Sequence, residues 1–204
     1  MLIRHESGAV PLELRGYTRL PERRMRRGEV FRSSDRGDLV ALRVVEGCLR
    51  VCHPLHDGRR QITDFLMPDD GIGIDEVRRH NGSIEAVTPA RVALLTADTA
   101  EAEGESELAQ ARIGAMQARL FMLGHKNARE KLAAFLLEMS ERIAPGEASF
   151  RLPMSRYDIA DYLCLSPETV CRNFTQMSSD GLISLPDSQT VQILHRAPLE
   201  FIGR

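Results

Sequence analysis

The chain has few cysteines, few lysines and no long apolar segment. Its 204 residues include four cysteines, which are too few and too scattered for a disulfide scaffold. No apolar run approaches the roughly 20 residues that a membrane-spanning helix needs. The N-terminal segment MLIRHESGAV has no apolar signal core. We therefore expect a cytoplasmic protein with no membrane partner.

Lysine occurs only at Lys126 and Lys131, so arginine carries nearly all of the positive charge. The formal net charge is −2, which excludes a polycationic chain. Arginines dominate residues 15–36, whereas the stretch DTAEAEGESE near residue 100 is acidic. Such runs are usually solvated surface, so neither of them assigns a function by itself.

The first half of the chain has the pattern of an antiparallel β domain. Short apolar runs are separated by turn sequences such as Asp-Arg-Gly and His-Asp-Gly. In the segment GCLRVCH, strict alternation divides the side chains between two strand faces: Leu49, Val51 and His53 on one, and Cys48, Arg50 and Cys52 on the other. Many short strands without intervening helices predict a β-sandwich or jelly roll over residues 1–103.

A helical pattern without proline follows over residues 104–126. Its apolar residues are spaced by three and four, which predicts an a/d-type seam made of Ile113, Met116, Leu120 and Leu123. Such a seam packs either on its own domain or against a second copy of the helix, and we expect a homodimer. Gly124 interrupts the pattern, and residues 124–127 are the expected hinge before the next unit.

Residues 127–204 predict a winged helix-turn-helix. A first helix ends at Ala144-Pro145-Gly146, and its apolar face consists of Leu132, Phe135, Leu136, Met139 and Ile143. A short helix SRYDIADYL, with Ile159, Ala160 and Leu163 inward, leads through a tight turn into a second helix. Ser166 is the expected N-cap of that helix, Pro167 its first residue and Gly181 its stop signal, and Val170, Phe174 and Met177 form its inner face. Two short strands around Pro-Asp-Ser complete the pattern.

The second helix of a helix-turn-helix enters the major groove of DNA. Glu168, Cys171 and Arg172 share one face of this helix, opposite its apolar side chains. A guanidinium can donate two hydrogen bonds to guanine, and a carboxylate can accept one from cytosine N4. The alternative is an exposed Glu–Arg pair on the helix, worth about 0.3–0.5 kcal/mol.

The sequence resembles the Crp/Fnr superfamily of bacterial transcription regulators over nearly its whole length. The resemblance rests on RRGEVFRSSDRGD, NAREKLAAFLLEMSER, LPMSRYDIADYL and SPETVCRNFTQMSSDGLI, and LPMSRYDIADYLCLSPETVCR and GIDEVRRHNGSIEAVT indicate the FixK-type branch. It implies an α+β fold with a jelly-roll, cyclic-nucleotide-binding-like domain at 1–103, a dimerisation helix at 104–126 and a winged helix-turn-helix at 127–204. It also implies a regulator and not an enzyme.

The resemblance further implies a homodimer on a palindrome like TTGAT-N4-ATCAA, with RNA polymerase as a further partner. Glu168 and Arg172 match the family's base-contacting residues, whereas Cys171 stands where a serine is usual and Cys164 where a glycine is usual. A thiol is a weaker hydrogen-bond partner than a hydroxyl, so contact with that base pair is in doubt. Contacts to DNA phosphates are expected from Ser155, Arg156, Ser166 and Thr169.

No cofactor or small ligand is expected. The segment GIGIDEVRRHNGSIEAVT lacks the Gly-Glu pair of cyclic-nucleotide binders, and His80-Asn81 occupies the place of their Arg-Ser. Fnr-type iron–sulfur clusters use cysteines near the N-terminus, but the first 47 residues contain none. Cys48 and Cys52 are about 13 Å apart at strand rise, too far to share a metal. Haem ligation through a histidine stays open as an alternative, although no spacing of the histidines supports it.

Two regulatory readings stay open. Either the protein binds DNA without a ligand, or Cys171 is a redox switch. Cys171 lies near a helix N-terminus and beside Arg172, features that favour the reactive thiolate; Cys164 is a second candidate thiol. The simpler alternative is a harmless variant at a tolerant position.

A cupin-like metalloenzyme is the remaining rival. The segment GCLRVCHPLH faintly resembles a cupin site, but it has His-x-x-His where cupins have His-x-His, with Gly58 and Arg59 in place of the acid. His53 and His56 would also face opposite sides of a strand. The sequence therefore disfavours this reading.

Overall fold

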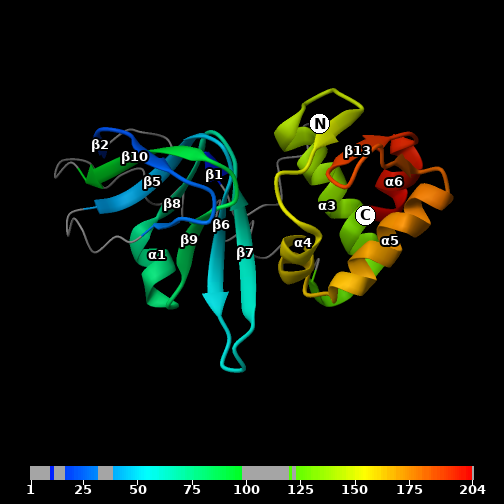
Figure 1. Ribbon diagram of the computed structural model, residues 1–204, viewed down its shortest axis with the longest axis horizontal. Helices are drawn as coiled ribbons and strands as arrows, with labels where there is room; N and C mark the ends of the chain where they lie inside the picture. The colour runs from blue at the N-terminus through cyan, green and yellow to red at the C-terminus, as the bar shows by residue number, and fades with distance from the viewer. Residues whose placement is uncertain (1–9, 12–16, 32–38, 98–119, 121–122, 204) are drawn as a thin grey trace. The chain divides into compact units, whose positions relative to one another are not determined.

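The computed structural model describes residues 10–11, 17–31, 39–97, 120 and 123–203. These residues divide into two compact units, an N-terminal unit (10–97) and a C-terminal unit (120–203) (Figure 1). The first consists of antiparallel strands and one short helix, and the second consists of helices with a small sheet. This architecture confirms the predicted α+β class.

The described strands of the N-terminal unit form two antiparallel sheets. One sheet has the order β1–β8–β5–β10–β2, with β3 also paired to β10, and the other has the order β4–β9–β6–β7. The bounds are β1 Val10–Pro11, β2 Tyr17–Arg19, β3 Arg23–Met25, β4 Val30–Phe31, β5 Leu39–Glu46, β6 Leu49–Pro54, β7 Arg60–Leu66, β8 Asp70–Gly73, α1 Ile74–Arg79, β9 Ser83–Ala86 and β10 Ala90–Ala97.

Apolar side chains from both sheets form the core of the N-terminal unit. Leu42, Val44, Leu49 and Val92 are all 0% exposed, and Ile74 and Val77 of α1 pack into the same cluster. Full burial of such a side chain stabilises the fold by about 1.5–3 kcal/mol. The jelly-roll prediction is therefore matched by two sheets that share one core.

One local expectation for the N-terminal unit was wrong. Residues 74–79 form α1, although the pattern predicted strands without intervening helices. Strand β6 is covered on both faces, because Cys52 is buried at 3% exposure together with Val51 at 2%. The pairing of β6 with β7 has a register shift at these two residues. The extra residue is Thr63 of β7, because Val51 pairs with Asp64 and Cys52 pairs with Ile62.

The main helix of the C-terminal unit is α3 (Ala128–Ile143), which the sequence places correctly. Asn127 caps this helix: its side chain accepts hydrogen bonds from the amides of Arg129 and Glu130, and Glu130 accepts one from the amide of Asn127. Four of the predicted inward side chains are 0% exposed, and the fifth, Ile143, is half-buried: Leu132, Phe135, Leu136 and Met139 form the buried set.

Helices α4 (Arg156–Leu163) and α5 (Pro167–Ser179) follow as predicted. The small sheet has the order β11–β13–β12 and consists of β11 Ser149–Arg151, β12 Ile183–Ser184 and β13 Thr190–Ile193. Strand β11 and the final helix α6 (Arg196–Gly203) are additions that the sequence pattern did not predict. Helix α6 packs on α3, where Gly203 lies against Ala134 and Leu137.

Candidate DNA-binding interface

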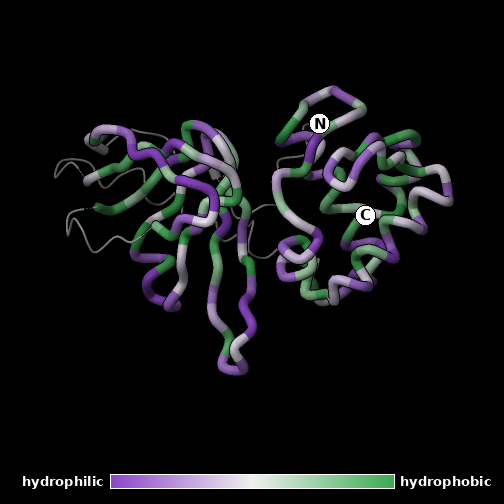
Figure 2. The backbone as a smooth tube through the Cα atoms, in the orientation of Figure 1, coloured by the Kyte–Doolittle hydropathy of each residue, from purple (hydrophilic) through white to green (hydrophobic). Residues whose placement is uncertain are grey.

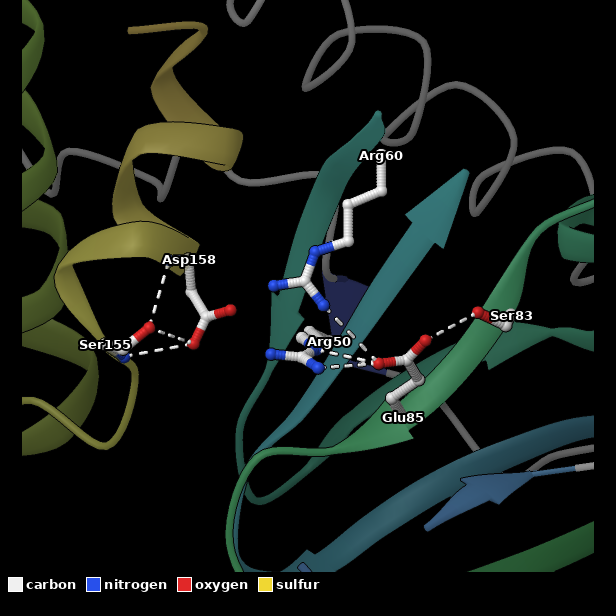
Figure 3. Close-up of polar contacts among 6 residues, drawn as sticks. All are labelled: Arg50, Arg60, Ser83, Glu85, Ser155 and Asp158. Carbon is white, nitrogen blue, oxygen red and sulfur yellow. Dashed lines mark hydrogen bonds and ion pairs between the residues drawn. The ribbon is translucent and has the colours of Figure 1, made fainter. Parts of the chain in front are cut away.

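Helix α4 starts from a reciprocal capping box. Ser155 Oγ accepts a hydrogen bond from the amide of Asp158 (3.1 Å), and Asp158 Oδ2 accepts from the amide (3.0 Å) and hydroxyl (2.8 Å) of Ser155 (Figure 3). Asp158 is 5% exposed, so its burial is compensated by these donors. The sequence singled out Ser155 as a phosphate contact; the structure shows that its hydroxyl already serves the cap.

The turn between α4 and α5 passes through Cys164, which has φ 55° and ψ 47°. This is the left-handed region, where a side chain costs on the order of 1 kcal/mol relative to glycine. The expected strain at this position is therefore present. Cys164 is exposed and is not part of a disulfide.

Helix α5 begins as the sequence predicts. Ser166 Oγ accepts a hydrogen bond from the amide of Thr169 (3.1 Å) and lies 3.0 Å from the Thr169 hydroxyl, and Pro167 is the first helical residue. Val170, Phe174 and Met177 are at most 2% exposed. The helix is amphipathic, and its hydrophilic and hydrophobic segments alternate along the tube in Figure 2.

The three predicted base-contacting residues all lie exposed on α5: Glu168, Cys171 and Arg172. The pKa of Glu168 is lowered, first by a hydrogen bond from its own backbone amide and then by one from Ser166. The carboxylate therefore stays ionised at neutral pH and can act only as an acceptor. This arrangement places one anionic acceptor and one cationic donor on the same free helix face.

Arg156 does not extend freely into solvent. It is half-buried, and its guanidinium carbon lies 3.3 Å from the centroid of the Phe174 ring, which belongs to α5. Burial lowers the pKa of Arg156 to about 10, while the neighbouring Cys171 opposes that shift. This contact between α4 and α5 was missed, because sequence spacing does not show which residues of two helices meet.

The far end of α5 is tied to α3. Arg129 Nη2 lies 2.6 Å from Asp180 Oδ2, and the Gln176 side chain donates to Asp180 Oδ1 (2.8 Å). Gly181 follows with φ 72°, which confirms it as the stop signal. The helix is thus fixed at both ends within the C-terminal unit.

The wing turn between β12 and β13 is organised by Asp187. Its Oδ1 accepts hydrogen bonds from the amides of Gln189 (2.7 Å) and Thr190 (2.8 Å), and its Oδ2 accepts from the Thr190 hydroxyl (2.8 Å). These donors, the Gln189 amide first, lower the pKa of Asp187 to about 2. The Pro-Asp-Ser sequence indicated this turn, although not the role of the aspartate.

The N-terminal unit has its own polar cluster, centred on β6 and β9 (Figure 3). Arg50 donates to Glu85 Oε2 through Nε (3.0 Å) and Nη2 (2.7 Å), and Ser83 Oγ lies 3.1 Å from Glu85 Oε1. Arg60 lies 3.8 Å from the same carboxylate. The charge of the Arg50 guanidinium is therefore balanced by a carboxylate of this sheet.

The segment around α1 carries no arginine–serine pair at the expected place. His80 and Asn81 are there instead: the His80 carbonyl lies 3.3 Å from His53 Nδ1, and Asn81 has φ 53°. His56 lies in the turn after β6, which corrects its expected place on a strand. Within the described ranges, no group of three or more His, Cys, Asp or Glu could hold a metal ion.

Two of the four residues of the predicted dimer seam fall outside the described residues. Ile113 and Met116 lie outside the described residues, and so does the predicted domain boundary after residue 103. Leu120 is helical and 63% exposed, and Leu123 is helical and half-buried. None of the helices that the structure describes is both long and apolar enough to cross a membrane.

Comparisons with known proteins agree with this architecture. Residues 130–202 match the Crp-like helix-turn-helix domain. The nitrogen fixation regulation protein FixK of Azorhizobium caulinodans is 36% identical over 187 residues, which cover 85% of this chain and 75% of that protein. FixK of Rhizobium meliloti is 36% identical over 168 residues, covering 81% and 79%.

Solved structures show the same fold. FixK2 from Bradyrhizobium japonicum superposes with a TM-score of 0.76 at 29% identity, covering 90% of this chain and 97% of that chain. A CooA mutant from Carboxydothermus hydrogenoformans, at 17% identity, has a TM-score of 0.69 and shares the fold. The chain belongs to the Crp/Fnr family as a FixK-like, DNA-binding transcription regulator, and it is not an enzyme.

Proposed function

We propose that the chain acts in the cytoplasm as a homodimer on a FixK/Fnr-type palindrome, with one α5 helix in each of two successive major grooves. The exposed face of α5 carries this proposal, because Glu168, Cys171 and Arg172 stand free of the core while Val170, Phe174 and Met177 anchor the helix. Arg172 donates to guanine and Glu168 accepts from cytosine N4. RNA polymerase is the further partner.

Phosphate contacts surround this face. Ser166 and Thr169 lie at the N-terminus of α5, where the helix dipole favours an anion. Ser155 lies at the N-terminus of α4, and because its hydroxyl is bonded to Asp158, the start of the α4 backbone is the better phosphate donor there. Arg156 supplies a cation beside the same helix end.

Binding is proposed to need no small ligand. Two observations on the N-terminal unit support this. Arg50 is engaged by Glu85, and His80 and Asn81 stand where cyclic-nucleotide binders place arginine and serine. Calorimetry that showed micromolar binding of cAMP or cGMP would overturn ligand independence without affecting DNA recognition.

The base contacts are tested by replacing each residue and comparing the affinity of the variant for different DNA sequences. Arg172→Ala should cost about 1–3 kcal/mol on the palindrome and should relax discrimination at one base pair of each half-site. Glu168→Gln should do the same at a different base pair. Uniform weakening across all DNA sequences would assign these residues to the phosphate backbone instead.

A redox switch at Cys171 is a second candidate function, favoured by the exposure of this thiol on the DNA-facing helix and by its interaction with Arg156. Hydrogen peroxide would convert the thiolate to a sulfenic acid and release hydroxide, which places bulk against the DNA. Peroxide should then inhibit DNA binding of the wild type but not of Cys171→Ser. Cys164→Ser is the matched control, and equal inhibition of the wild type and Cys171→Ser would exclude this switch.

A further inference from the structure

The contact between Arg156 and Phe174 joins the two helices of the helix-turn-helix. Arg156 is the first residue of α4, and its guanidinium carbon lies 3.3 Å from the Phe174 ring centroid, well inside the roughly 6 Å range of a cation–π interaction. Phe174 is only 2% exposed and is held by the core of the C-terminal unit. The ring is therefore a fixed platform, and the arginine is the side chain that is oriented by it.

The guanidinium on this platform has unused donors. It carries five N–H groups, yet within the part of the chain that the structure describes Arg156 has no hydrogen-bond or ion-pair partner. Its position is also unfavourable for a cation, because the N-terminus of α4 is the positive end of the helix dipole. Burial lowers its pKa to about 10, which leaves it charged at neutral pH.

A cation that is partly desolvated, oriented and without a carboxylate partner among the described residues suits a ligand that brings negative charge. A phosphodiester matches the planar donor edge of a guanidinium, and the proposed function already brings DNA phosphates to the start of α4. An arginine side chain normally loses rotamer freedom when it binds. An arginine that already rests on a ring has lost part of that freedom before DNA arrives.

We propose that Phe174 is a positioning residue for DNA binding: its ring pre-organises the Arg156 guanidinium to receive a backbone phosphate. The proposal rests on the proposed DNA-binding function and deepens it. Phe174 is a buried residue of α5, and it affects DNA affinity indirectly, through Arg156 of α4. The pair therefore couples the recognition helix to the phosphate contact of its neighbour.

A double-mutant cycle tests the proposal. Phe174→Leu keeps an apolar side chain but removes the ring, and it should weaken binding to the palindrome about fivefold. In an Arg156→Met background the same substitution should change affinity by less than about twofold. Arg156→Met itself should reduce the slope of log affinity against log salt by about 0.9 per phosphate contact, or about two units for a dimer.

Controls separate this effect from damage to the core. Met177→Leu changes another buried position of the same face of α5, and should leave DNA affinity unchanged. Phe174→Met serves as a second ring-free variant if the leucine variant is poorly folded by circular dichroism. The proposal is overturned if ring removal weakens binding equally with and without Arg156, or if Arg156→Met leaves the salt slope unaltered. Failure of the wild type to prefer the palindrome would instead overturn the proposed function.

Discussion

The amide of Leu165 donates a hydrogen bond to the carbonyl of Ala160 (3.0 Å) across the turn that joins α4 to α5. The amide of Cys164 donates to the same carbonyl. The Cys164 bond is an ordinary helical one, whereas the Leu165 bond requires Cys164 to adopt its left-handed conformation, in which a Cβ atom crowds the backbone. The turn of the helix-turn-helix thus uses a left-handed backbone conformation that cysteine disfavours.

Replacing Cys164 by glycine should stabilise the C-terminal unit. The substitution relieves left-handed strain on the order of 1 kcal/mol, from which the greater chain entropy of glycine in the unfolded state subtracts a part. Guanidinium unfolding should therefore show a higher midpoint for Cys164→Gly than for Cys164→Ala, which also removes the thiol but keeps Cβ. Equal midpoints for the two variants would contradict the strain.

The wing turn should make stability dependent on pH through Asp187. Its pKa falls from 3.8 to about 2 on folding, so the unfolded state binds the proton more tightly than the folded state. The stabilisation by Asp187 is consequently full above the unfolded value and is lost as the pH falls from about 4 towards 2. The stability difference between the wild type and Asp187→Ala should be constant from pH 7 to 5 and shrink below pH 4. A difference that does not vary with pH would contradict this assignment.

The dimer prediction is tested on the seam. Ile113→Asp combined with Leu120→Asp places charges in the predicted interface, so the double variant should elute as a monomer on a sizing column and lose palindrome binding. Leu194→Asp is a matched control, because Leu194 is also exposed (46%) but lies at the end of the small sheet. A double variant that remains dimeric would place the interface elsewhere.

The helix-turn-helix could be predicted almost residue by residue because its signals are local. The cap at Ser166, Pro167 at the first helical position and Gly181 after the last turn each act within a few residues of themselves. The three-and-four spacing of Val170, Phe174 and Met177 fixed the buried face for the same reason.

The missed features depend on contacts between distant residues. The Arg156–Phe174 pair needs the crossing of two helices, which no periodicity in either helix contains. The burial of both Val51 and Cys52 depends on the elements that cover β6, which alternation along one strand does not show. Helix α1 has six residues, too few for helical spacing to emerge from a segment rich in turn sequences.

Competition binding on a FixK/Fnr-type palindrome tests the central claim most directly. The purified chain should bind a duplex that contains TTGAT-N4-ATCAA at least about 10³-fold more tightly than a scrambled duplex of equal composition, at one fixed salt concentration. This preference should depend on the exposed residues of α5, so it should fall when Arg172 is replaced by alanine. Equal affinity for the two duplexes would contradict the account.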